Sequence, residues 1–203
     1  MDRIVSGITE YKKNKYKVCM DDGTHLVLYK GEVHRYRLQE GQTVDEALYQ
    51  ELFYEVVGKR VKKLALLEKM DRTEQGLYRK LAESEYPEEL ILDAIEYVKK
   101  YHYIDDMRYA RNYISYRQGS KSRRRLQQEL MQKGVPKEIT EQALEEIYEN
   151  NDTEKIAEIL KKRHYNPEQP DAKEMQKQYG YLMRRGYKSE DILRVMKCPD
   201  YLT

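Results

Sequence analysis

The chain has 203 residues, of which 39% are hydrophobic and 36% are charged. Its 38 basic and 36 acidic residues leave a net charge of only +2, which excludes a positive electrostatic field over the whole protein. Two distant cysteines and four scattered histidines exclude a disulfide framework and a zinc site. No apolar run approaches the roughly 18 residues of a membrane span, and the first residues lack the apolar core of a signal peptide, so we expect a cytoplasmic protein without membrane, metal or cofactor.

The first part of the chain has the pattern of short strands. Residues 16–20 and 25–29 are strand-like on either side of Asp22-Gly23, a strong hairpin turn. Lys30-Gly31 suggests a second turn before a further strand from Val33 to Leu38. We therefore expect a small antiparallel sheet over residues 1–42, which needs a helix to pack on.

A long helix follows the strands. Thr43 and Glu46 have the spacing of a capping box, and apolar residues recur at helical spacing to about residue 69. Gly58 lies inside this pattern and predicts a bend or break. No proline- or serine-rich linker separates the sheet from this helix.

The rest of the chain repeats itself at an offset of 49 residues. Leu77, Leu81, Pro87 and Ala94 recur as Leu126, Leu130, Pro136 and Ala143. A third copy follows with one inserted residue, because Leu182 and Gly186 stand 52 residues after Leu130 and Gly134, and Ile192 stands 53 after Ile139. Repeats of this length indicate stacked supersecondary units, which usually present an extended binding surface.

Each repeat has the signals of three helices. In the second copy Asp105 is the expected cap of a helix over 106–117, Ser122 caps 123–133, and Pro136 opens 136–149. In the first copy Thr73 and Pro87 occupy the matching starts, and in the third we expect helices over 153–163, 172–185 and 189–197 around an insert that carries Pro167 and Pro170.

The fold class we expect is mainly α: tandem three-helix repeats in an elongated curved array, preceded by the β module. The expected segments are the β module over 1–42, the long helix and first repeat over 43–103, the second repeat over 104–150 and the third over 151–203.

The middle repeat has a strong charge asymmetry. Residues 107–137 carry a net charge of +8 and residues 138–158 a net charge of −7. Lys121, Arg123, Arg124 and Arg125 surround the start of a helix, where positive charge opposes the macrodipole and an anionic partner would relieve it. The alternative is a solvated face neutralised by Glu141, Glu145 and Glu146 of the next helix.

The ordered motifs of the central block resemble the signature of the RecX family, regulators of the RecA recombinase. These motifs are Tyr103-Ile104-Asp105-Asp106-Met107-Arg108-Tyr109-Ala110, the basic run over residues 119–126, and Glu129 to Val135 with its Lys-Gly stop. The resemblance extends over about residues 60–197. Tyr109 stands where the family usually has phenylalanine, and Ser122 where glycine is common.

The resemblance implies a partner and a role. It implies that the protein binds the RecA filament on single-stranded DNA, lies along its helical groove, and modulates strand exchange and the SOS response, more commonly as an inhibitor. We expect a monomer whose partner is the RecA filament, and direct contact with single- or double-stranded DNA is an open alternative to contact with RecA alone.

The basic residues of the second and third repeats are our candidates for RecA or DNA contacts. They are Arg117, Lys121, Arg123, Arg124, Arg125, Lys133, Lys161, Lys162, Arg163, Arg184 and Arg185.

No catalytic constellation is visible. Phosphate-loop, dinucleotide and nucleophile-elbow motifs are absent from the sequence, and Asp105-Asp106 fits a helix cap better than an acid/base pair. We therefore expect a protein that is not an enzyme. A stand-alone DNA-binding protein with repeats like helix-turn-helix units, and a helical scaffold for another protein, remain the alternatives.

Overall fold

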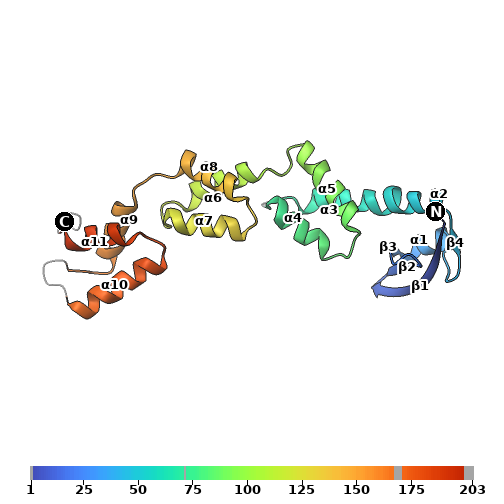
Figure 1. Ribbon diagram of the computed structural model, residues 1–203, viewed down its shortest axis with the longest axis horizontal. Coiled ribbons are helices and arrows are strands. Elements are labelled where there is room, and N and C mark those ends of the chain that lie inside the picture. The colour runs from blue at the N-terminus through green and yellow to red at the C-terminus, as the bar shows by residue number, and fades with distance from the viewer. Residues whose placement is uncertain (1, 71, 167–170, 199–203) are drawn as a thin grey trace. The chain divides into compact units, whose positions relative to one another are not determined.

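The computed structural model describes residues 2–70, 72–166 and 171–198 and consists mainly of helices with a small antiparallel sheet at the N-terminus (Figure 1). Its contacts divide the chain into two compact units, Met1–Asp105 and Asp106–Thr203. The expected fold class, mainly α with an N-terminal antiparallel β module, is therefore confirmed. The insert prolines, Pro167 and Pro170, lie outside the described residues.

The sheet of unit 1 has four antiparallel strands in the order β3-β2-β1-β4. They are β1 (Arg3–Lys12), β2 (Lys15–Met20), β3 (His25–Tyr29) and β4 (Thr43–Val44). Ile8 pairs with Val18, and Val18 with Leu26, in the central register. The predicted turn at Asp22-Gly23 is confirmed, because Gly23 has a φ of +84°, a conformation that glycine adopts without strain.

Two local predictions around the sheet are wrong. Residues after Lys30 form helix α1 (Lys30–Arg35) instead of a strand, because the Glu32 carboxylate accepts a hydrogen bond from the Tyr29 amide at 2.7 Å and fixes a helix start. Thr43 does not cap the next helix, since it pairs with Ile4 in the sheet. Asp45 takes that role and accepts from the Leu48 amide at 2.7 Å.

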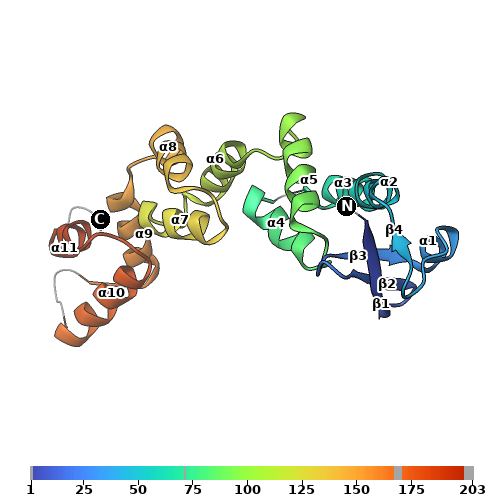
Figure 2. The ribbon, with the colours of Figure 1, turned by 45° about the vertical axis from the view of Figure 1, so that its right-hand side comes forward.

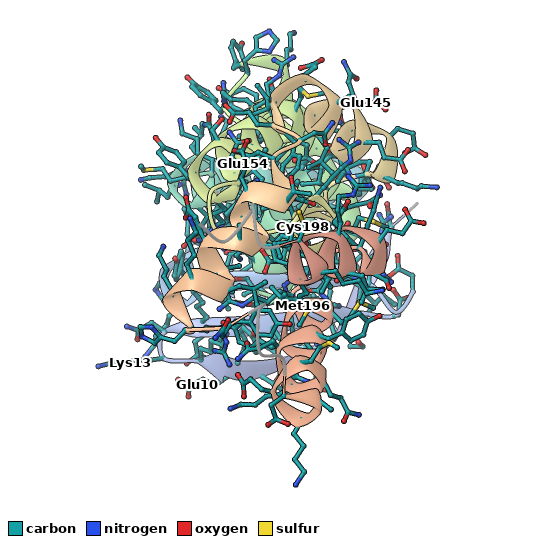
Figure 3. The ribbon with its side chains drawn as sticks, turned by 90° about the vertical axis from the view of Figure 1, so that its left-hand side faces the viewer. Glu10, Lys13, Glu145, Glu154, Met196 and Cys198 are labelled. Atoms are coloured by element: carbon teal, nitrogen blue, oxygen red, sulfur yellow. The ribbon has the colours of Figure 1, made fainter. Side chains whose placement is uncertain are left out.

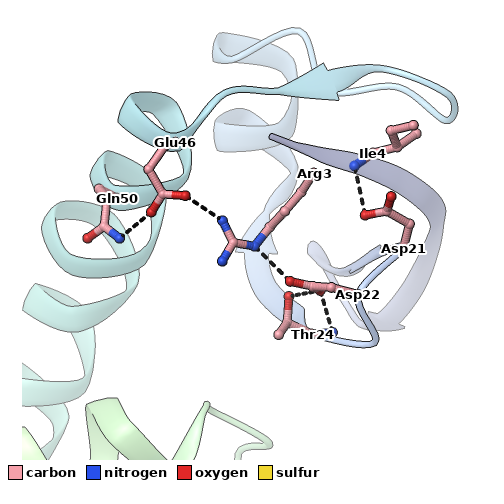
Figure 4. Close-up of polar contacts among 7 residues, drawn as sticks. All are labelled: Arg3, Ile4, Asp21, Asp22, Thr24, Glu46 and Gln50. Carbon is pink, nitrogen blue, oxygen red and sulfur yellow. Dashed lines mark hydrogen bonds and ion pairs between the residues drawn. The ribbon is translucent and has the colours of Figure 1, made fainter. Parts of the chain in front are cut away.

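The Arg3 side chain ties the first strand to two other elements (Figure 4). Its guanidinium lies 2.8 Å from Asp22 in the hairpin turn and 3.0 Å from Glu46 at the start of helix α2 (Glu46–Gln50). It also covers the Tyr49 ring at 3.7 Å from the centroid. Arg3 thus contacts the hairpin turn and the helix that follows the sheet, in addition to the hydrophobic core that these elements share.

The long helix of unit 1 is continuous and changes type twice. After α2 comes the π-helical segment η1 (Glu51–Gly58), followed by α3 (Lys59–Glu68). The Lys59 amide donates to the Tyr54 carbonyl five residues back, and Gly58 has ordinary helical backbone angles, so the chain is not broken there, and the change from π- to α-helix falls at the predicted glycine. Strand β3 packs against η1, which brings Leu52, Phe53 and Val57 into the core (Figure 2).

Helices α3, α4 (Glu74–Ala82) and α5 (Glu88–Lys100) pack together as the first three-helix unit. Thr73 caps α4 by accepting from the Gly76 amide at 2.9 Å, as predicted. Pro87 precedes α5 and occupies its N-cap. These helices share one hydrophobic core with the sheet.

Unit 2 contains two three-helix units, each with its own core. The first consists of α6 (Asp106–Arg117), α7 (Arg123–Gln132) and α8 (Lys137–Ile147), and the second of α9 (Asp152–Lys162), α10 (Ala172–Arg184) and α11 (Ser189–Lys197). Gly134 and Gly186, which the third-copy offset relates, follow α7 and α10 with φ of +90° and +86°. The repeated positions Leu126, Leu130 and Leu182 are fully buried, as the periodicity predicts.

Candidate functional site

Basic side chains from the second and third repeats line one cleft in unit 2. The cleft has a volume of about 430 Å³ and is lined by Ser120, Lys121, Arg125, Glu129, Arg184 and Arg185. Lys121 and Arg125 come from the start of α7, whereas Arg184 and Arg185 come from the end of α10. Four cations from two repeats therefore face a volume that contains a single carboxylate.

A second cleft of about 250 Å³ shares Ser120 and Arg185 with the first. It adds Lys155, Lys162 and Arg163 from α9 and its C-terminal end, with Glu158 as the acidic group. We call the two clefts together the basic cleft. Their shared residues make the positive surface continuous from α7 to α9.

Glu129 is the internal counter-ion of the basic cleft. Its carboxylate lies 2.5 Å from Lys121 Nζ and 2.9 Å from Arg125 Nε, and it accepts a hydrogen bond from the Tyr113 hydroxyl at 2.8 Å. Burial opposes ionisation, but the hydrogen bonds from Lys121, Tyr113 and Arg125 outweigh it, so the pKa of Glu129 is lowered. The carboxylate thus stays ionised and offsets part of the local positive charge.

The Tyr113 ring is surrounded by cations. Arg117, Lys121 and Lys133 lie over it, at 4.8, 5.9 and 5.4 Å from the ring centroid. Burial and the neighbouring Glu129 raise the pKa of Tyr113 to about 12. This ring therefore supports three of the predicted site residues through cation–π contacts.

Tyr181 supports the cations of the third repeat in a similar way. The guanidinium carbons of Arg163 and Arg185 lie 4.0 and 4.6 Å from its ring centroid. Arg163 also donates a hydrogen bond to Gln178, which is buried. These contacts hold Arg163 and Arg185 near Ser120 without neutralising them.

Of the other predicted residues, Arg123, Arg124 and Lys161 lie outside the basic cleft, whereas Lys162 lines it. Arg123 turns toward the end of α8, donates to the Leu144 carbonyl at 3.1 Å, and lines a different cleft with Arg194. Arg124 and Lys161 are exposed and form no ion pair with any residue that the structure describes. Lys162 lies 3.6 Å from Glu158. Of the arginine run, only Arg125 faces the cleft.

The acidic helix α8 does not neutralise the basic run. Glu146 pairs with Arg111 at 2.6 Å, and Glu141 lies 3.8 Å from Lys137. Glu145 is exposed on the outside of α8 (Figure 3). Glu141 and Glu146 thus pair with other cations, and the carboxylate that pairs with Arg125 is Glu129 on α7 itself.

The sequence did not identify Glu129, Ser120 and Tyr181 as residues of the candidate site. A signal for Glu129 was present, because it stands four residues after Arg125 on a helix, the spacing at which opposite charges pair. Ser120 and Tyr181 belong to different repeats, and only the packing of these repeats shows that they adjoin one surface.

The basic residues at the start of α3 in unit 1 have acidic partners. Lys59 pairs with Glu55 at 2.6 Å, Arg60 with Glu32, and Lys62 with Asp93 at 2.8 Å. Within residues 2–70, 72–166 and 171–198 no cluster of metal-ligating side chains occurs, and no described helix is long and apolar enough to cross a membrane.

Replacing Glu129 with glutamine should strengthen the binding of polyanions. Release of Lys121 and Arg125 should raise the affinity for a single-stranded oligonucleotide by about fivefold per freed cation at 0.1 M salt, since each phosphate contact contributes about 0.7 to the log–log salt slope. Fluorescence anisotropy measures this effect. Glu138→Gln removes the same charge from an exposed, unpaired position of α8 and is the control; equal gains from both variants would contradict a special role of Glu129.

The same variant should also lose stability in a pH-dependent way. Because the folded-state pKa of Glu129 lies below its unfolded value, its contribution of about 1–2 kcal/mol is present above the unfolded pKa and is lost as the pH falls through the folded pKa. The difference in unfolding free energy between the parent and Glu129→Gln should therefore disappear in acid.

Comparison with known proteins shows the family to which this chain is similar. Residues 105–144 match the second three-helix domain of RecX, and residues 150–196 match the third. The chain is 30% identical over 193 residues to the regulatory protein RecX of Caldanaerobacter subterraneus subsp. tengcongensis, covering 93% of this chain and 95% of that protein. The chain belongs to the RecX family.

Other RecX proteins show the same extent of similarity. The regulatory protein RecX of Clostridium acetobutylicum is 28% identical over 193 residues, which cover 92% of this chain and 90% of that protein. A crystal structure of regulatory protein RecX has a TM-score of 0.57 at 23% identity and covers 95% of this chain and 98% of its own. RecX from Lactobacillus salivarius has a TM-score of 0.59 at 22% identity, over 69% of this chain and 94% of its own. These structures support the fold.

Proposed function

We propose that this RecX-family chain is a non-enzymatic, negative regulator of the RecA recombinase that binds the RecA filament on single-stranded DNA. The observation that carries the proposal is the basic cleft, in which Lys121, Arg125, Arg184 and Arg185 from two repeats share one lining carboxylate. A filament presents repeated anionic groups along a groove, and a surface with separated cations matches such a target.

The location of the cleft supports filament binding over reading of a DNA groove. The candidate reading helices of a helix-turn-helix unit are α7 and α8, and α8 carries exposed acidic residues such as Glu138 and Glu145 that phosphates would repel. The cations lie instead at the junction of two repeats. The protein would act as a cytoplasmic monomer during DNA recombination, DNA repair and the SOS response.

The test is a titration of the purified protein into RecA reactions. We expect substoichiometric amounts to reduce single-strand-dependent ATP hydrolysis and strand exchange, and to sediment with RecA–DNA filaments. Unchanged rates over the whole titration, without co-sedimentation, would refute the proposal. Tight, sequence-specific binding of duplex DNA without RecA would favour a stand-alone DNA-binding protein.

A further inference from the structure

Ser122 makes two hydrogen bonds that connect the second repeat to the third. Its Oγ accepts from the Arg125 amide at 3.2 Å, which caps α7, and donates to the Arg185 carbonyl at 2.8 Å, 63 residues further along the chain. A hydroxyl has one proton and two lone pairs, so both bonds form at once. The side chain is fully buried, so water does not compete for these partners.

Gly186 permits this close approach. It has a φ of +86°, and a Cβ atom at this position would lie 2.8 Å from Ser122 Oγ and 3.3 Å from the Arg125 amide nitrogen. The turn after α10 therefore rests directly on the first turn of α7. The Ser122 hydroxyl therefore links the backbone of Arg125 to the backbone of Arg185, and both residues line the cleft.

A second polar contact joins the same repeats on the α8–α9 side. The Tyr148 hydroxyl donates to Asp152 at the start of α9 and accepts from Lys155 Nζ at 3.1 Å. Lys155 is 7% exposed, and burial lowers its pKa although Asp152 opposes the shift. A buried polar network costs desolvation unless its geometry is satisfied, so it favours one arrangement of its members over others.

We infer that Ser122 and Tyr148 are positioning residues that hold the second and third repeats in one fixed orientation, so that the cations of both repeats act together on one anionic partner. Only four residues, 148–151, connect α8 to α9, and they do not by themselves fix the angle between the two helical units. Preorganised cations bind without the entropic cost of first being brought together. The second half of this inference rests on the proposed function.

The experiment measures orientation and binding separately. Spin labels at Gln128→Cys and Glu190→Cys, both exposed sites, report the distance between α7 and α11 by double electron–electron resonance in a Cys19→Ser, Cys198→Ser background. The test variant is Ser122→Gly with Tyr148→Phe, neither of which removes a charge from the basic cleft. Glycine keeps most of the N-cap preference but removes the hydroxyl, and phenylalanine keeps the ring but removes the hydroxyl that contacts Asp152 and Lys155.

We expect one narrow distance in the parent and a broad distribution in the double variant, with circular dichroism unchanged. Binding of RecA filaments on a poly(dT) strand should weaken by about 25-fold at 0.1 M salt, and the log–log salt slope should fall by about 1.4, as for two lost phosphate contacts. Thr73→Gly, which removes the equivalent cap of α4 in unit 1, should change neither the distance nor the slope.

The possible outcomes are separable. An unchanged distance distribution in the double variant would overturn the positioning role. A broadened distribution with unchanged affinity and slope would overturn the link between orientation and binding. If the parent itself fails to bind filaments, the proposed function and the binding half of the inference are refuted, while the distance distributions still decide how the repeats are held.

Discussion

Simultaneous replacement of Arg125, Arg184 and Arg185 by alanine should weaken the binding of RecA–DNA filaments about 100-fold at 0.1 M salt. All three guanidinium groups line the same cleft, although they come from different repeats. Three phosphate-type contacts, each contributing about 0.7 to the slope of log affinity against log salt concentration, give a change of about 2 in both the slope and the logarithm of affinity at 0.1 M. Co-sedimentation or anisotropy over a salt series measures both quantities.

A matched variant separates the cleft from net charge. The control variant also removes three positive charges from unit 2, by the substitutions Arg123→Ala, Arg124→Ala and Lys161→Ala. None of these three side chains lines the basic cleft. We expect less than a fivefold loss for this control. Equal losses for both triple variants would show that only total charge matters.

Leu130→Ala should lower the unfolding free energy by about 2–5 kcal/mol, because truncation of a fully buried leucine loses transfer free energy and leaves a cavity. Leu130 packs in the core of the second repeat with Leu126, Ala143 and Leu144. Urea denaturation of the full chain, followed by far-ultraviolet circular dichroism, should show an earlier transition for the unit that contains this repeat.

Two further substitutions serve as controls for the loss of unfolding free energy expected in Leu130→Ala. Met131, the next residue, is 47% exposed, so Met131→Ala should cost much less. Ile139 is only partly buried against the same core, and Ile139→Ala should fall between the two. A loss for Met131→Ala as large as that for Leu130→Ala would contradict the assigned core.

Most of the helical part of the fold could be predicted because its signals are local and repeated. Apolar spacing identified Leu126 and Leu130 as core, Ser122 as a cap and Gly134 as a helix stop, and the structure confirms each assignment. Agreement between copies strengthened these signals, since chance patterns rarely recur at the same offset.

The errors occurred where distant partners decided the local structure. The helix at Lys30 depends on Glu32, whose carboxylate binds both the Tyr29 amide and Arg60 of α3. Thr43 has a good capping sequence, but pairing with Ile4 competes for its backbone. Neither partner is visible from spacing within a few residues.

The candidate site was predictable as a set of cations but not as a surface. The sequence singled out all four cations of the first cleft, but it also included Arg123 and Arg124, which face elsewhere. That cations of α7 and α10 line the same cleft depends on the packing of the third repeat against Ser122, a contact over 63 residues. Helical spacing alone carries no information on such a contact.

The π-helical segment Glu51–Gly58 makes the first part of the chain sensitive to length as well as to the type of its buried residues Leu52, Phe53 and Val57. Each residue of an α-helix advances the direction of the side chains by about 100°. Inserting one residue into this segment would therefore turn α2 by about that angle relative to α3 and carry Tyr49 and the Glu46 partner of Arg3 away from the sheet. During divergence of the family, substitutions at exposed positions of the segment, such as Glu55, would be tolerated more readily than single-residue insertions.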